Sequence, residues 1–151
     1  MRVVIDANVL ARAVYGAGGP AERAVSLVTQ LPHTLVLSPF IVHELRRVLR
    51  YPRLQRVHGF DDLKIDELVD NLEASATVIL LSDKDVLPVV TQDPDDDPIV
   101  ATAMAGKADV LCTLDKHFYQ PDVIHYCQSH GIRVLTDVEL LHLLRSESSS
   151  D

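Results

Sequence analysis

QDPDDDPIVATA, residues 92–103, contains four aspartates within five positions and leads into the small and apolar residues of an expected helix. Two carboxylates about 5 Å apart repel each other by roughly 3 kcal/mol at an effective dielectric constant near 20. Side chains of this run that turn inward therefore need a cation, whereas those that face water need none. The simpler interpretation is helix capping, because Asp93-Pro94 and Asp97-Pro98 each match an N-cap residue followed by a first-turn proline.

Short apolar runs alternate with helical patterns along the rest of the chain. Expected strands cover residues 2–6, 34–37, 77–81, 109–113 and 133–135. Besides the helix after the acid run, expected helices cover residues 7–14, 20–31, 39–50, 61–75, 121–130 and 137–145. Strands buried on both faces read as unbroken apolar runs, and helices provide the crossovers between parallel strands. The pattern predicts an α/β fold with a central, mainly parallel sheet of about five strands, covered by helices on both faces.

Acidic residues follow four of these strands. Asp6 ends the first strand, Glu44 lies in the helix after the second, the acid run follows the third, and Asp115 comes just after the fourth. The carboxyl ends of parallel strands share one edge of a sheet, so these acids are expected to converge there. Each acid alone could be a turn or cap residue, and Glu44 could simply pair with Arg47. Together they predict a site for Mg²⁺ or Mn²⁺, which prefer oxygen ligands and could activate water to hydrolyse a phosphodiester.

The helix expected over residues 39–50 combines a buried stripe with a basic face. Its apolar positions follow the helical period: Ile41, Leu45, Val48 and Leu49. Arg47 lies one turn from Glu44, whereas Arg46 and Arg50 are expected to point outward. The net charge of −8 argues against a protein that coats nucleic acid, but not against an enzyme with a metal-loaded acidic pocket. Arg46, Arg47 and Arg50 are thus candidates for substrate phosphate contacts, the alternative being a solvated helix face.

Length and composition bound the remaining possibilities. A chain of 151 residues predicts one domain over residues 1–145, followed by a polar, disordered tail over residues 146–151. No apolar run approaches the length of a membrane span, so a soluble, cytoplasmic protein is expected. Cys112 and Cys127 are not in a CxxC pair, and Cys112, in an apolar strand, is expected to be a reduced core residue. The seven histidines lack zinc-site spacing, and none is expected as a general base or among the acids.

At these residues the chain resembles the PIN-domain nucleases. The similarity runs through successive blocks: VIDANVL (4–10), GAGGPAERAV (16–25), SPFIVHELRRVLRYPRL (38–54), DPDDDPIVATAMAGKADVLCTLDKHF (93–118) and GIRVLTDVELL (131–141). Their order is most similar to the VapC-like branch, whose members are toxin components of toxin–antitoxin pairs. The resemblance implies a three-layer α/β/α fold and a divalent-metal-dependent endoribonuclease acting on RNA. It also implies an antitoxin partner and a homodimer.

The resemblance carries over to single residues. Matching the family's acidic motif positions implies metal-binding and catalytic roles for Asp6, Glu44, Asp96 and Asp115. Supporting positions are Asn8, Thr113 and Asp97, the last being the alternative to Asp96 as ligand. The chain departs from the family's pattern at three positions. Ala7 stands where the family usually has threonine, Pro98 where a polar residue is usual, and His117 where this branch often has aspartate.

Two other functions compete with the nuclease. The first is a catalytically silent PIN-like module that binds RNA or protein, which the presence of all four acids disfavours. The second is an acid-pocket phosphotransfer domain. That fold requires a lysine after the fifth strand, where this chain has Thr136-Asp137.

Overall fold

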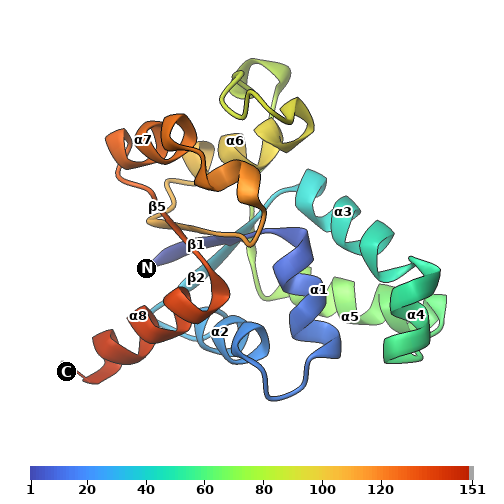
Figure 1. The fold of residues 1–151 in the computed structure, drawn as a ribbon. Coiled ribbons are helices and arrows are strands. Elements are labelled where there is room, and N and C mark those ends of the chain that lie inside the picture. Colours follow the sequence, from blue (N-terminus) through green and yellow to red (C-terminus); the bar gives the residue numbers. More distant parts are fainter. Residues whose placement is uncertain (150–151) are drawn as a thin grey trace.

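The computed structural model describes residues 1–149, which are built around a five-stranded sheet of order β3-β2-β1-β4-β5 (Figure 1). The strands are β1 (Arg2–Ile5), β2 (Thr34–Leu37), β3 (Thr77–Val78), β4 (Val110–Cys112) and β5 (Arg133–Leu135). All four neighbouring pairs are parallel. The predicted α/β architecture with a central parallel sheet is confirmed. The third strand is shorter than expected. It ends at Val78, and the Ile79 N–H makes one further hydrogen bond, of 2.7 Å, to the Leu37 carbonyl.

Eight α-helices surround the sheet in the described residues. They are α1 (Ala7–Tyr15), α2 (Pro20–Val28), α3 (Pro39–Leu49), α4 (Pro52–His58), α5 (Asp62–Ala74), α6 (Asp97–Ala105), α7 (Pro121–Ser129) and α8 (Asp137–Ser149). Three short 3₁₀ helices join them: η1 (Asp83–Asp85), η2 (Pro94–Asp96) and η3 (Lys116–Tyr119). Helix α4 was not expected as a separate element. None of the helices within residues 1–149 has both the length and the apolar character needed to cross a bilayer.

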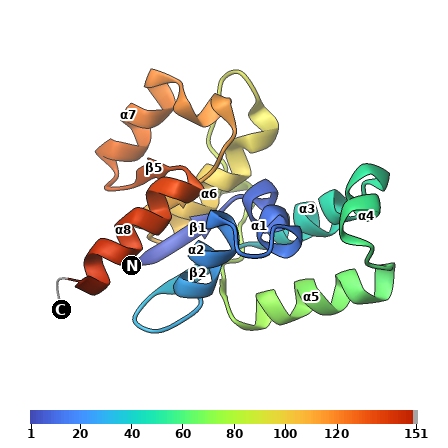
Figure 2. The same cartoon turned by 60° about the horizontal axis from the view of Figure 1, so that its bottom comes forward.

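The helices form a layer on each face of the sheet. Figures 1 and 2 show α6 and α7 on one side, with α2 and α8 on the other. Helix α6 contacts β1, β2 and β4, while α8 packs against both α2 and β5. Strand β1 lies in the middle, and Val3, Val4 and Ile5 are fully buried. Cys112 is a buried free thiol, as predicted, and Cys127 is one as well.

The C-terminal expectation is wrong for residues 146–149. Helix α8 runs to Ser149, so the polar segment continues the helix instead of starting a disordered tail at residue 146. Ser146, Glu147 and Ser148 are exposed, which the last turns of a helix tolerate. The expectation for residues 150 and 151 lies outside the described residues.

The strand order places a crevice at the carboxyl ends of β1 and β4. The chain leaves β1 toward β2 and β3, but leaves β4 in the opposite direction toward β5. Helices after such neighbouring strands diverge to opposite faces, which opens a space at the sheet edge where ligands bind in α/β proteins. Asp6 follows β1 directly, and Thr113 follows β4 directly. The topology therefore brings the first and last predicted acids to one place.

Candidate metal centre

A cavity of about 520 Å³ lies at this edge of the sheet, and all four predicted acids line it: Asp6, Glu44, Asp96 and Asp115. Asn8, predicted as a supporting residue, also lines the cavity, as do Asp93 and Asp95. The acids come from four separate parts of the chain, which only the tertiary fold brings together. The predicted convergence at one edge of the sheet is found in the structure.

Asp6 and Asp115 are joined through Thr113. Asp6 is 5 % exposed, and its Oδ2 accepts a 2.9 Å hydrogen bond from the Thr113 hydroxyl. The same hydroxyl oxygen accepts a 3.1 Å bond from the Asp115 backbone N–H. Burial raises the pKa of the Asp6 carboxyl, the Thr113 hydrogen bond opposes this effect, and the negative charge of Asp115 adds to it. Thr113 thus ties the Asp6 carboxylate to the backbone of Asp115.

Asp96 reaches the cavity because the acid run begins as a 3₁₀ turn. Asp93 is its N-cap and accepts a 3.2 Å hydrogen bond from the Asp95 backbone N–H, as expected for a helix starting at Pro94. The turn then continues into α6. Burial first, and then the charges of Asp115 and Asp93, raise the pKa of the Asp96 carboxyl to about 8. Its Oδ2 is buried and has no hydrogen-bond partner within residues 1–149.

Asp97 turns the other way. It is 7 % exposed, and its Oδ1 accepts hydrogen bonds of 3.0 and 2.7 Å from the backbone N–H groups of Val89 and Val90. Its carboxylate therefore anchors the loop before the acid run, and Val86 of that loop lines the cavity. The geometry favours Asp96 over Asp97 as a candidate ligand, while Asp97 supports the wall of the cavity.

Glu44 lines the cavity but is already paired. Arg47 Nη2 lies 2.6 Å from Glu44 Oε2, and Arg47 Nη1 donates a 2.5 Å hydrogen bond to the Tyr51 hydroxyl. Glu44 therefore forms the ion pair with Arg47 that the sequence offered as the alternative to a metal-binding role. Arg47 also lines the cavity, so one positive charge lies at the rim of the acidic site. Opposite charges at this separation attract each other, so an ion bound at Glu44 must compete with Arg47.

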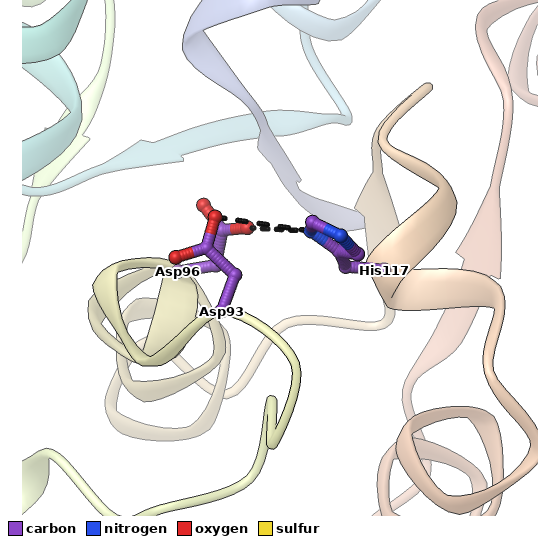
Figure 3. A group of neighbouring side chains, drawn as sticks. All are labelled: Asp93, Asp96 and His117. Carbon is purple, nitrogen blue, oxygen red and sulfur yellow. Dashed lines mark ion pairs between the residues drawn. The ribbon is translucent and has the colours of Figure 1, made fainter.

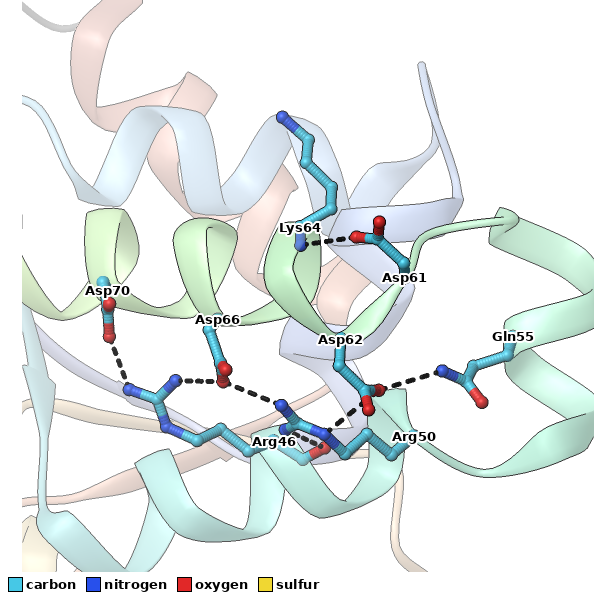
Figure 4. A network of polar contacts seen from close by, with 8 residues as sticks. All are labelled: Arg46, Arg50, Gln55, Asp61, Asp62, Lys64, Asp66 and Asp70. Carbon is cyan, nitrogen blue, oxygen red and sulfur yellow. Dashed lines mark hydrogen bonds and ion pairs between the residues drawn. The ribbon is translucent and has the colours of Figure 1, made fainter.

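Arg46 and Arg50 do not point outward as predicted. Figure 4 shows both guanidinium groups facing α5, where Arg46 contacts Asp66 at 2.9 Å and Asp70 at 2.6 Å. Arg50 lies 2.9 Å from Asp66 and 3.4 Å from Asp62. The sequence held a signal for this arrangement, because Asp62, Asp66 and Asp70 recur every four residues and form one acidic stripe along α5.

His117 and Asp93 belong to the site and were missed as candidates. Figure 3 shows the His117 ring facing both Asp93 and Asp96. Its Nδ1 lies 3.4 Å from an oxygen of Asp115, 3.8 Å from Asp93 and 3.9 Å from Asp96. The expectation that no histidine lies among the acids is therefore wrong. The signal was the Asp115-Lys116-His117 spacing, since a 3₁₀ turn capped by Asp115 brings His117 back toward it.

The residues of this cavity fit a divalent cation. Carboxylate oxygens predominate, which suits a hard ion. The raised pKa of both Asp6 and Asp96 indicates crowded negative charge in a buried space, a condition that a cation relieves. The unpaired Asp96 Oδ2 offers a ligand atom that no protein donor satisfies within residues 1–149.

Comparison with known proteins places the chain in a family. Residues 2–117 match the family model of the PIN domain. No protein of curated function matches the sequence. The fold is similar to a chain in the crystal structure of VapBC2 from Rickettsia felis bound to a DNA fragment from their promoter. The TM-score is 0.61 and the identity 15 %, over 90 % of this chain and 98 % of that one. Because the PIN model spans most of the sequence and the fold agrees, this chain belongs to the PIN domain family.

Proposed function

We propose that this protein is a divalent-metal-dependent endoribonuclease that hydrolyses phosphodiester bonds of RNA. The observation that carries the proposal is that buried Asp6 and half-buried Asp96 and Asp115 line one cavity at the sheet edge. Asp96 has a pKa near 8 there and a carboxylate oxygen without a donor in residues 1–149, so the cavity is built for a cation. Strongly perturbed carboxyl groups in a cavity are typical of functional sites.

Asp6, Asp96 and Asp115 would hold Mg²⁺ or Mn²⁺, and Glu44 would join them on release from Arg47. The bound ion would supply a Lewis acid that polarises the phosphodiester and lowers the pKa of an attacking water. Thr113 holds the Asp6 carboxylate in place through its hydroxyl. Arg47, once released from Glu44, carries a guanidinium group at the rim that can donate two hydrogen bonds to a phosphate.

The proposal extends to partners. RNA is the proposed substrate, and an antitoxin protein encoded beside this chain is the proposed inhibitor, which would make the chain the toxin of the pair. The sequence blocks shared with the toxin branch and the fold similarity to the VapBC2 chain support this part of the proposal. We further propose that the protein is a cytoplasmic homodimer. Light scattering of the purified protein tests the dimer, and a stable inhibitory complex with the product of a neighbouring small gene tests the antitoxin.

Cleavage of end-labelled RNA by the purified chain tests the activity. Cleavage should require Mg²⁺ or Mn²⁺, stop with chelator, and be lost in Asp6→Asn, Asp96→Asn and Asp115→Asn. Asparagine keeps the side-chain shape but removes the negative charge that a hard cation needs. The matched control is Asp83→Asn, an exposed acid of η1 outside the cavity, which should cleave normally. RNA binding that persists in chelator without any cleavage by the wild type would instead identify a silent binding module.

A further inference from the structure

The ring nitrogen Nδ1 of His117 lies close to the carboxylates of Asp93, Asp96 and Asp115. We propose that Asp93, Asp96 and His117 form a binding position for a first-row transition-metal ion, so that the centre prefers such an ion over Mg²⁺. This inference rests on the proposed function, because Asp96 would belong to both. It adds two residues, Asp93 and His117, that are not among the four matched acids, and it specifies the chemical class of the metal.

The separations between the candidate ligand atoms suit a shared ion. His117 Nδ1 lies 3.8 Å from Asp93 Oδ2 and 3.9 Å from Asp96 Oδ2. All three residues offer ligand atoms within 4.8 Å of one another. Two ligands that each lie about 2.1 Å from one ion are separated by about 3.0 Å to 4.2 Å, depending on the angle at the metal. The two gaps from the imidazole nitrogen are too long for hydrogen bonds but fall within this range.

Two of the three candidate ligand atoms make no hydrogen bond within residues 1–149, although Asp115 Oδ1 lies 3.4 Å from His117 Nδ1. His117 Nδ1 and Asp96 Oδ2 are both buried and make no hydrogen bond within residues 1–149. Buried polar atoms are normally hydrogen-bonded, so two unpaired atoms facing each other point to a missing third component. The third ligand is already oriented, because Asp93 Oδ1 accepts from the Asp95 N–H and leaves Oδ2 toward the imidazole.

The backbone also holds His117 in position. The backbone N–H of His117 donates a 2.9 Å hydrogen bond to Oδ1 of Asp115, the N-cap residue of η3. The ring is therefore placed by the turn and needs little rearrangement to meet an ion. A ligand position that is fixed before binding costs less conformational entropy when the ion arrives.

The identity of the donor atoms sets the preference. Mg²⁺ selects oxygen ligands, whereas an imidazole nitrogen suits transition ions, whose affinities rise from Mn²⁺ through Co²⁺ to Ni²⁺. A mixed set of one imidazole and two carboxylates should therefore separate Co²⁺ from Mg²⁺ more strongly than the carboxylates alone. Within the proposed choice between Mg²⁺ and Mn²⁺, it favours Mn²⁺.

Metal titration of the full chain tests this assignment without any cleavage assay. Co²⁺ is the probe because its visible absorption changes with its ligands and coordination geometry, and Mg²⁺ is the competitor. The key variant is His117→Asn, which places an amide oxygen near the Nδ1 position. We expect Co²⁺ affinity to fall about 10- to 100-fold in this variant, comparable to the loss of a supporting metal-site residue, with Mg²⁺ affinity nearly unchanged. Asp93→Asn should weaken Co²⁺ binding as well.

The controls separate this inference from the nuclease proposal. The chain has seven histidines, so His125→Asn, on α7 outside the cavity, must leave the Co²⁺ spectrum unchanged. Thermal melts in chelator show whether each variant is folded. If His117→Asn does not fold, Asp93→Asn with the same two titrations decides in its place. Equal affinity changes for Co²⁺ and Mg²⁺, or none for either, overturn the inference. Cleavage supported by Mg²⁺ in that case would leave the nuclease proposal standing.

Discussion

Asp96 and Asp97 are adjacent in the chain but have opposite surroundings. Asp97 accepts from two buried backbone N–H groups, those of Val89 and Val90. Asp97→Ala leaves both donors unpaired, at about 1–3 kcal/mol each, so we expect a loss of about 2–6 kcal/mol in the free energy of unfolding. Asp97→Asn keeps an acceptor oxygen and should lose much less stability and retain cleavage. Urea denaturation measures both variants, and equal stability of Asp97→Ala and wild type would contradict the anchoring role.

The Asp96 carboxyl makes the stability of the metal-free protein depend on pH. Its pKa rises from 3.8 to about 8 on folding, because of burial and then the charges of Asp115 and Asp93. Between these values the folded protein holds a proton that the unfolded chain has released. The stability contributed by this group is therefore complete below about pH 4 and is lost as the pH rises to about 8.

Thermal melts in chelator test this pH dependence. The wild-type melting temperature should fall between about pH 5.5 and about pH 8.5. Asp96→Asn, which cannot ionise, should show a smaller fall, although Asp6 also has a raised pKa and contributes in the same direction. Identical profiles for the two proteins would mean that Asp96 keeps an ordinary pKa in the folded state.

At the scale of elements, the arginines of α3 have two different surroundings, the cavity and helix α5. Arg47 lines the cavity, whereas Arg46 pairs with Asp66 and Asp70 of α5. We expect Arg47→Ala to weaken RNA binding and to reduce the magnitude of its salt slope by about 0.7, the value for one phosphate contact on a single strand. Arg46→Ala should leave that slope unchanged and instead lower the melting temperature by a few degrees, less at high salt.

The comparison of these two variants is decisive because the arginines are neighbours on one helix. Arg56→Ala, on α4, is a suitable control, since the Arg56 side chain makes no hydrogen bond or ion pair within residues 1–149. A reduced salt slope in Arg46→Ala would restore the sequence-based expectation that this residue contacts phosphates. Unchanged stability in Arg46→Ala would show that the α3–α5 ion pairs contribute little, as many exposed pairs do.

At the scale of the whole molecule, a bound cation should stabilise the fold by joining distant segments. The cavity is lined by residues following β1 and β4, by the acid run and by α3. With a dissociation constant near 1 mM, about 10 mM Mg²⁺ adds about 1.4 kcal/mol of stability. For a chain of this size, that raises the melting temperature by about 3–6 °C. Calorimetry should show this shift in wild type but not in Asp6→Asn, and no shift in wild type would contradict the metal site.

The sequence alone determined the strands and most of the helices, because their signals are local. The apolar run of residues 2–6 and the Ser38-Pro39 helix start depend only on neighbouring residues, and both elements are found. The acid convergence was also predictable, since parallel strands share a direction. Helix α4 was missed because Tyr51-Pro52 ends one helix and starts another, and its own sequence has no buried face to give a periodic pattern.

Only the tertiary structure decided which polar groups meet. Arg46 and Arg50 face α5 because that helix folds back against α3, an arrangement that no spacing within either helix determines. His117 reaches Asp93 because the turn after β4 and the turn before α6 approach each other at the sheet edge, although 24 positions separate the two residues. The choice between Asp96 and Asp97 likewise depends on the loop of Val89 and Val90, which takes one of two adjacent carboxylates and leaves the other for the cavity. Hydrogen bonds and charge pairs act over a few ångströms in space, so the fold must form before they can be assigned.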